Sequence, residues 1–98
     1  MNKEKKKEYQ SLLVKLTEIL YALDPIGIVD DDMPNDEYMP EAGKIIPRLR
    51  EANSPEGLSV IMYQVFAYQF DEKSAGCPSK YISAAKEFWK FCEQYGIK

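Results

Sequence analysis

The chain contains no histidine and only two cysteines among its 98 residues. Histidine is the commonest general base and a frequent partner of cysteine in zinc sites, so its absence removes most of the familiar catalytic and metal-binding constellations. Cys77 and Cys92 form no paired zinc motif and supply two soft ligands at most. We therefore expect two free thiols in a reducing cytoplasm, with Cys92 inside a helix and Cys77 on a loop.

Glycine-rich phosphate loops, strand-like alternation, internal repeats and low-complexity segments are also missing. The most apolar window, 57–70, carries no charge but has only 14 residues, fewer than the roughly 20 that cross a bilayer. The apolar run at 12–23 is interrupted by Lys15 and Glu18, and no small-residue cleavage site follows it. We expect neither a membrane span nor an export signal.

The charge balance argues against nucleic acid as a partner. The chain has 13 basic and 16 acidic residues, a formal net charge of -3, and gathers Lys3, Lys5, Lys6 and Lys7 at one end. Neutralising phosphates needs a longer basic face than this cluster provides. An apolar fraction of 45% with 12% aromatic residues is typical of an ordered protein. The length is that of a single domain, 1–98.

Apolar residues recur at helical spacing along most of the chain, which predicts an all-α fold. The first helix should end before Asp24, because Pro25 disfavours the helical conformation there. Ser54 followed by Pro55 is a typical helix start, and Pro47 should kink or split the helix that contains it. We predict a compact bundle of four helices over about 5–23, 38–52, 55–70 and 79–95, with a loop at 71–78.

The helix predicted at 55–70 is apolar around nearly its whole circumference. Its main face is apolar throughout, and four further residues cover much of the rest: Val60, Tyr63, Ala67 and Tyr68. A helix of this kind is either the central one of its bundle or partly covered by another chain. Homodimerisation through this helix is therefore one alternative for the function.

The stretch 24–41 holds seven carboxylates and three prolines and has no basic residue. When Asp30 is counted as the first ligand of a calcium-binding loop, three further acids fall at ligand positions. However, Pro34 replaces one ligand and Asn35 replaces the glycine of the turn. We therefore prefer a solvated acidic loop and keep calcium binding as an alternative. The three further acids are Asp32, Asp36 and Glu41.

Few residues of the chain are candidates for catalysis. Cys77 has no histidine to activate it, and Glu87 and Glu93 lie on the polar face of their predicted helix, away from any di-metal site in the core. We expect no cofactor and no enzymatic activity. The alternative is a metal-dependent or carboxylate-based enzyme that uses Asp36 and Glu37.

Tyrosine occurs seven times. Tyr9, Tyr81 and Tyr95 fit the core faces of their helices. Tyrosine is also enriched at protein interfaces, where a large ring and a hydroxyl both find partners. We predict that Tyr38, Tyr63 and Tyr68 line a partner-binding surface together with the acidic loop. The predicted site residues are Asp30, Asp31, Asp32, Asp36, Glu37, Tyr38, Tyr63 and Tyr68.

Several of these features occur together in one known group. An amphipathic helix ending in DPIG at 24–27, then PNDEY at 34–38, then Glu41 and a helix led by Ser54, resembles the YugE-like group of small bacterial proteins of unknown function. The likeness covers about residues 8–70. It implies a helical fold and no established activity. Many members have glycine or alanine before the motif's proline, where this chain has Asp32-Met33, so the loop here is more acidic.

These observations lead to one functional hypothesis. We expect a small cytoplasmic bacterial protein that binds another protein, with the acidic loop steering a basic partner and nearby aromatic side chains supplying affinity. A regulatory role fits this hypothesis. So does toxin immunity, since the sequence is also similar in general appearance to the immunity proteins that accompany bacterial toxins.

Overall fold

A computed structural model of the chain describes residues 3–27 and 38–96, with side chains from residue 8 onward. Within these ranges the fold is all-α, as predicted, and has no β-strand. In chain order, the five α-helices and two 3-10 segments are α1 (Lys3–Leu23), α2 (Met39–Ile45), η1 (Ile46–Glu51), α3 (Pro55–Gln69), α4 (Glu72–Ala75), η2 (Pro78–Tyr81) and α5 (Ile82–Gln94).

The first helix ends at Leu23, where the sequence predicted its end. Asp24 takes a left-handed conformation with φ of 47°, which aspartate tolerates better than most residues and which avoids the right-handed region disfavoured before Pro25. The backbone N–H of Gly27 donates to the carbonyl of Asp24 across 3.1 Å. The chain therefore leaves α1 through a tight, hydrogen-bonded turn.

The predicted kink at Pro47 is a change of helix type. α2 passes directly into the 3-10 turns of η1, and Pro47 occupies one of the first positions of η1. Proline has no N–H to donate and presses on the preceding turn, so regular α-helix cannot continue through it. In the structure Tyr38 occupies the N-cap position of α2 without a capping hydrogen bond from its side chain.

The loop predicted at 71–78 contains a helix, so the prediction of four helices is wrong for the described residues. Asp71 caps α4: one carboxylate oxygen accepts the N–H of Ser74 at 2.6 Å, and the other accepts its hydroxyl at 3.0 Å. Gly76, at φ of 85°, follows the last residue of α4. A helix of one turn shows no apolar periodicity, and the cap was its only signal in the sequence.

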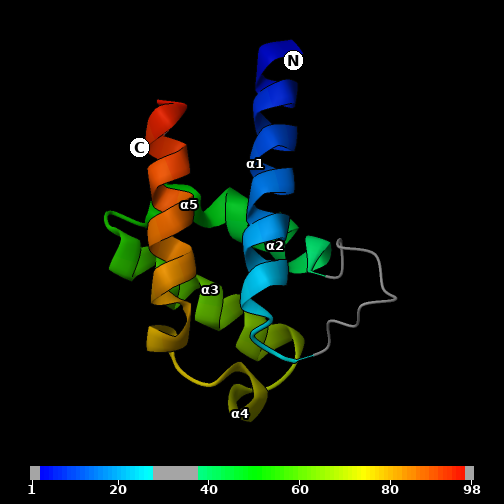
Figure 1. Cartoon of the computed structure of the whole chain (residues 1–98), viewed down its shortest axis with the longest axis vertical. Helices are drawn as coiled ribbons and strands as arrows, with labels where there is room; N and C mark the ends of the chain where they lie inside the picture. Colours follow the sequence, from blue (N-terminus) through cyan, green and yellow to red (C-terminus); the bar gives the residue numbers. More distant parts are fainter. Residues whose placement is uncertain (1–2, 28–37, 97–98) are drawn as a thin grey trace.

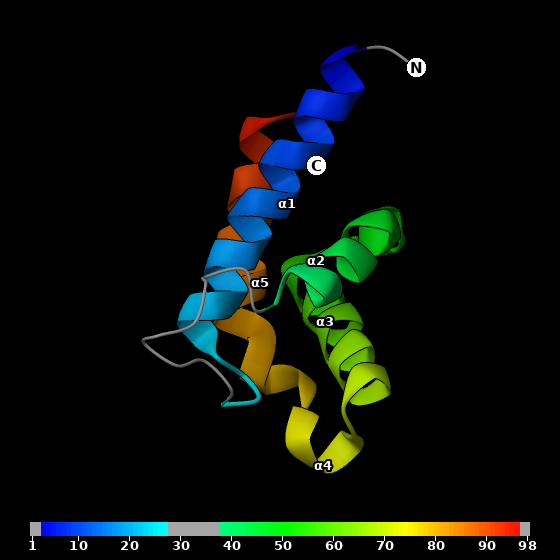
Figure 2. The same cartoon turned by 90° about the vertical axis from the view of Figure 1, so that its right-hand side faces the viewer.

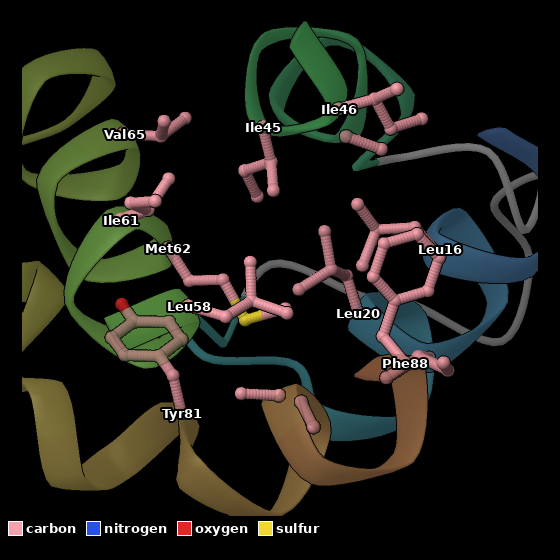
Figure 3. Close-up of a cluster of buried hydrophobic side chains, with 14 of the residues drawn as sticks. Leu16, Leu20, Ile45, Ile46, Leu58, Ile61, Met62, Val65, Tyr81 and Phe88 are labelled. Atoms are coloured by element: carbon pink, nitrogen blue, oxygen red, sulfur yellow. The ribbon is translucent and has the colours of Figure 1, made fainter. Parts of the chain in front are cut away.

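The helices form two layers. α1 packs along α5, α2 packs with α3, and contacts of α1 with α2 and of α3 with α5 join the layers. Figure 1 shows α1 and α5 side by side, and the turned view in Figure 2 shows α2 and α3 to one side of them. Figure 3 shows the core between the layers, where Leu16 and Leu20 of α1 meet Ile45 of α2, Met62 of α3 and side chains of the C-terminal segment.

The three tyrosines assigned to core faces differ in their exposure. Tyr81 is fully buried, as expected, whereas Tyr9 and Tyr95 are 42% and 48% exposed and so lie at the margin of the core. Among the described helices, none is both long and apolar enough to cross a membrane.

Candidate functional site

The five acidic residues of the predicted site lie outside the residues that the structure describes. They are Asp30, Asp31, Asp32, Asp36 and Glu37. The calcium alternative rests on the same segment and lies outside them too. Glu41, which closes the acidic stretch, is buried in the first turn of α2. Across the described ranges, no three cysteine, aspartate or glutamate side chains are grouped as a metal ion would need.

Tyr38 corrects part of the predicted surface. Its side chain is fully buried, and its ring meets Phe66 edge-on at a centroid distance of 5.6 Å. Its hydroxyl donates to a carboxylate oxygen of Asp24 at 2.5 Å and accepts the N–H of Ile26 at 3.4 Å. Tyr38 therefore cannot line a surface for a partner. Its hydroxyl links it to the beginning of the acidic stretch, and its ring packs into the core.

A lysine from the far end of the chain reinforces this junction. The ammonium of Lys80, in η2, donates to the carbonyl of Pro25. Pro25 is itself buried. The residues flanking the acidic stretch are thus held by α1, α2 and η2 together.

Tyr68, in contrast, lies on the molecular surface. It is 86% exposed, the most exposed large apolar side chain described, and Val60, two turns earlier on α3, is 41% exposed. Tyr63 and Ala67 are half-buried beside them and pack against the margin of the core. We call this surface the outer face of α3 and define it as Val60, Tyr63, Gln64, Ala67 and Tyr68.

The outer face of α3 is uncharged: Val60, Gln64 and Tyr68 are exposed on it, whereas Tyr63 and Ala67 pack against the margin of the core. α3 belongs to the layer away from α1 and α5, and its far side looks outward in Figure 2. The buried face of α3 carries Leu58, Met62 and Phe66. α3 packs against α2, η1, α4, η2 and α5, and it still leaves the apolar side chains of Val60 and Tyr68 in solvent.

A groove borders this face on the side of α2 and η1. It has a volume of about 330 Å³ and is lined by Lys44, Arg48, Gln64, Val65, Tyr68 and Gln69. Its two cations, Lys44 and Arg48, were not among the predicted site residues, because they come from different elements of the chain and only the fold brings them beside α3. Their spacing of four residues, on one side of α2 and η1, was the available signal.

Hydrogen bonds hold Arg48 in place. Its Nε lies 3.1 Å from a carboxylate oxygen of Glu51, and its Nη2 donates to the side-chain carbonyl of Gln64 at 2.7 Å. The hydrogen bonds from Arg48 lower the pKa of the Glu51 carboxyl. The bond to Gln64 links η1 directly to the outer face of α3.

A second groove, of about 520 Å³, runs between α1 and α5 and includes Val14, Lys15, Glu18 and Phe91. The ammonium of Lys15 lies 5.7 Å from the centre of the Phe91 ring, a cation–π contact within the chain. Its lining carries one cation and one carboxylate together with neutral groups. The charges that line this groove therefore favour neither an acidic nor a basic partner.

Cys77 and Cys92 are both free thiols, the first exposed and the second buried. The Ser79 hydroxyl, 3.0 Å from the sulfur, is the largest cause of a lowered pKa at Cys77, and backbone N–H groups add to it.

Comparison of the chain with protein-family models, curated proteins and solved structures finds no match.

Proposed function

We propose that this protein binds another protein through the outer face of α3. The observation that supports the proposal is that α3, apolar nearly all round and packed against five other elements, still leaves large apolar side chains in solvent. Tyr68 is 86% exposed and Val60 41% exposed on its uncovered side. An exposed tyrosine beside apolar neighbours is the composition found at the centre of protein interfaces.

The energetic argument favours a protein over a small molecule. A ligand pocket normally surrounds most of its ligand, whereas the side chain of Tyr68 is 86% exposed and is not enclosed. Burying a side chain of this size stabilises a complex by about 1.5 to 3 kcal/mol. Such a gain needs an extended partner surface that covers the ring on several sides.

The acidic stretch remains part of the proposal. Asp30, Asp31, Asp32, Asp36 and Glu37 would steer the partner by their charge and mainly raise the association rate. A regulatory role, and the toxin-immunity role suggested by the general similarity to immunity proteins, belong to the same proposal.

Photo-crosslinking tests the surface directly. A benzophenone amino acid is placed at Tyr68 in the cells from which the gene comes, and a matched one at Lys86, which is exposed on α5. We expect a discrete adduct with a second protein from position 68 and none from position 86. No adduct, or the same adducts from both positions, would overturn the proposal. An adduct of twice the chain's own mass would replace it with homodimerisation through α3.

A further inference from the structure

The groove beside the outer face of α3 is built mainly from hydrogen-bond donors. Lys44 stands in the last turn of α2 and is exposed. No described residue forms an ion pair with it. Arg48 adds a second cation, partly matched by Glu51. The lining contains no carboxylate, although the chain as a whole has a net charge of -3.

The glutamines of the lining extend this pattern. The side-chain carbonyl of Gln64 already accepts from Arg48, so its amide nitrogen is the group left to bind elsewhere. The amide nitrogen of Gln69 is shielded from solvent and has no acceptor among the described residues. An unmet buried donor is unfavourable. A rotation of this amide toward an acceptor that entered the groove would supply the missing bond.

The apolar part of the groove lies next to the donors. Val65, only 6% exposed, belongs to the core that this side of α3 covers, and the ring of Tyr68 stands beside it at 86% exposure. A volume of about 330 Å³ is enough for one or two side chains but small for most free ligands. The groove therefore combines a small apolar recess with a cationic rim.

We propose that this groove binds an acidic segment of the partner protein. A carboxylate would pair with Lys44, and a neighbouring apolar or aromatic side chain of the segment would pack against Val65 and Tyr68. Charge complementarity favours this occupant, because the charge-assisted hydrogen bonds that lysine and arginine make to carboxylates are about twice as strong as neutral ones. A basic segment would meet Lys44 and Arg48 with like charge. The inference rests on the proposed function, since the groove shares Gln64 and Tyr68 with the outer face of α3.

The test uses a labelled short peptide of glutamates with one phenylalanine and one leucine, and a matched peptide in which lysine replaces every glutamate. Each is titrated into the isotope-labelled protein. We expect the glutamate peptide to shift the amide signals of Lys44, Arg48 and Tyr68, and the lysine peptide to leave them unchanged. Equal binding of both peptides, or shifts that cluster elsewhere, would overturn the inference.

Variants make the test site-specific. Lys44→Glu should weaken binding of the glutamate peptide by more than about tenfold, since it replaces an attraction by a repulsion. The matched control Lys86→Glu makes the same charge change on exposed α5 and should leave binding within about twofold. Equal losses in both variants would mean that net charge alone governs binding, which contradicts the groove.

Two further results separate this inference from the proposed function. A crosslink from position 68 without binding of the glutamate peptide would remove the acidic segment and leave protein binding intact. Peptide binding without any crosslink would contradict the proposed binding of a partner protein, but it would still show that the groove binds carboxylates. If light scattering shows a dimer that Lys44→Glu converts to monomer, the occupant is a second copy, and the proposed partner segment is wrong.

Discussion

At the scale of single residues, Tyr38 shows how far a side chain's role can depart from its neighbourhood in the sequence. It follows Asp36 and Glu37, which suggests a solvent-exposed loop, yet it is fully buried against Phe66. Its sequence neighbours could not reveal a contact with a ring so far along the chain. Tyr68 was easier to place, because helical spacing puts it at the flank of the buried face of α3.

Replacing Tyr38 by phenylalanine should destabilise the fold. The ring can remain beside Phe66, but the carboxylate of Asp24 loses a donor and the N–H of Ile26 loses an acceptor. Removing one partner of a hydrogen bond to a charged group costs about 1 to 3 kcal/mol. Urea unfolding measures this loss. Tyr68→Phe, at an exposed position, is the control and should change the free energy of unfolding by less than about 0.5 kcal/mol. Equal stability of the two variants would contradict the role given to Tyr38.

Tyr81 should make stability depend on pH in the alkaline range. Burial first, with the phenol of Tyr63 and the thiol of Cys77 nearby, raises the pKa of Tyr81 from 10 to about 12. Its hydroxyl donates to the carbonyl of Ala75 at 2.7 Å. Below pH 10 the phenol is protonated in both the folded and the unfolded chain. Above that pH only the unfolded chain loses the proton, so this contribution to stability falls as pH rises through 12.

The variant Tyr81→Phe isolates the effect, because it removes this titration and leaves the other tyrosines in place. The stability advantage of the natural chain over the variant should be constant below pH 10 and shrink between pH 10 and 12. Chemical unfolding of both proteins over this range measures the difference. An advantage that stays constant to pH 12 would contradict a raised pKa in the folded state.

At the scale of secondary-structure elements, the sequence predicted most boundaries for reasons that the structure bears out. α1 ends where Pro25 requires it, and the second helix changes type near Pro47. α3 begins at the serine cap and proline that mark its start. The missing element was α4, which depends on the side chain of Asp71 and on Tyr81 for its contact with the rest of the fold. Neither contact leaves a periodic pattern in the sequence.

The cap of α3 provides a prediction at this scale. The N–H of Gly57 donates to the hydroxyl of Ser54 at 3.1 Å, so Ser54→Ala should lower the free energy of unfolding by about 1 kcal/mol. Thermal or urea unfolding measures the loss. Ser83→Ala, at an exposed position within α5, makes the same chemical change without a cap and is the control. A loss at Ser83 as large as that at Ser54 would show that the cap is not the cause.

At the scale of the whole molecule, the arrangement of layers decides which surfaces are free to bind. The apolar circumference of α3 left two possibilities in the sequence, a central helix or one covered by another chain. In the structure α3 contacts α2, η1, α4, η2 and α5, as a central helix would, and yet Tyr68 and Val60 are exposed. It also brings Lys44 and Arg48 beside α3, a juxtaposition that no local pattern could predict because it depends on how α2 and α3 pack.

The most direct measurement is calorimetric binding of the protein that crosslinks from position 68 to three purified forms of this chain: the natural sequence, Tyr68→Ala and Lys86→Ala. Both substituted side chains are exposed, so neither change should unfold the protein. The account predicts that Tyr68→Ala weakens binding by about 2 kcal/mol or more, roughly thirtyfold, whereas Lys86→Ala stays within about twofold. If Tyr68→Ala also binds within about twofold of the natural chain, the outer face of α3 is not the binding surface.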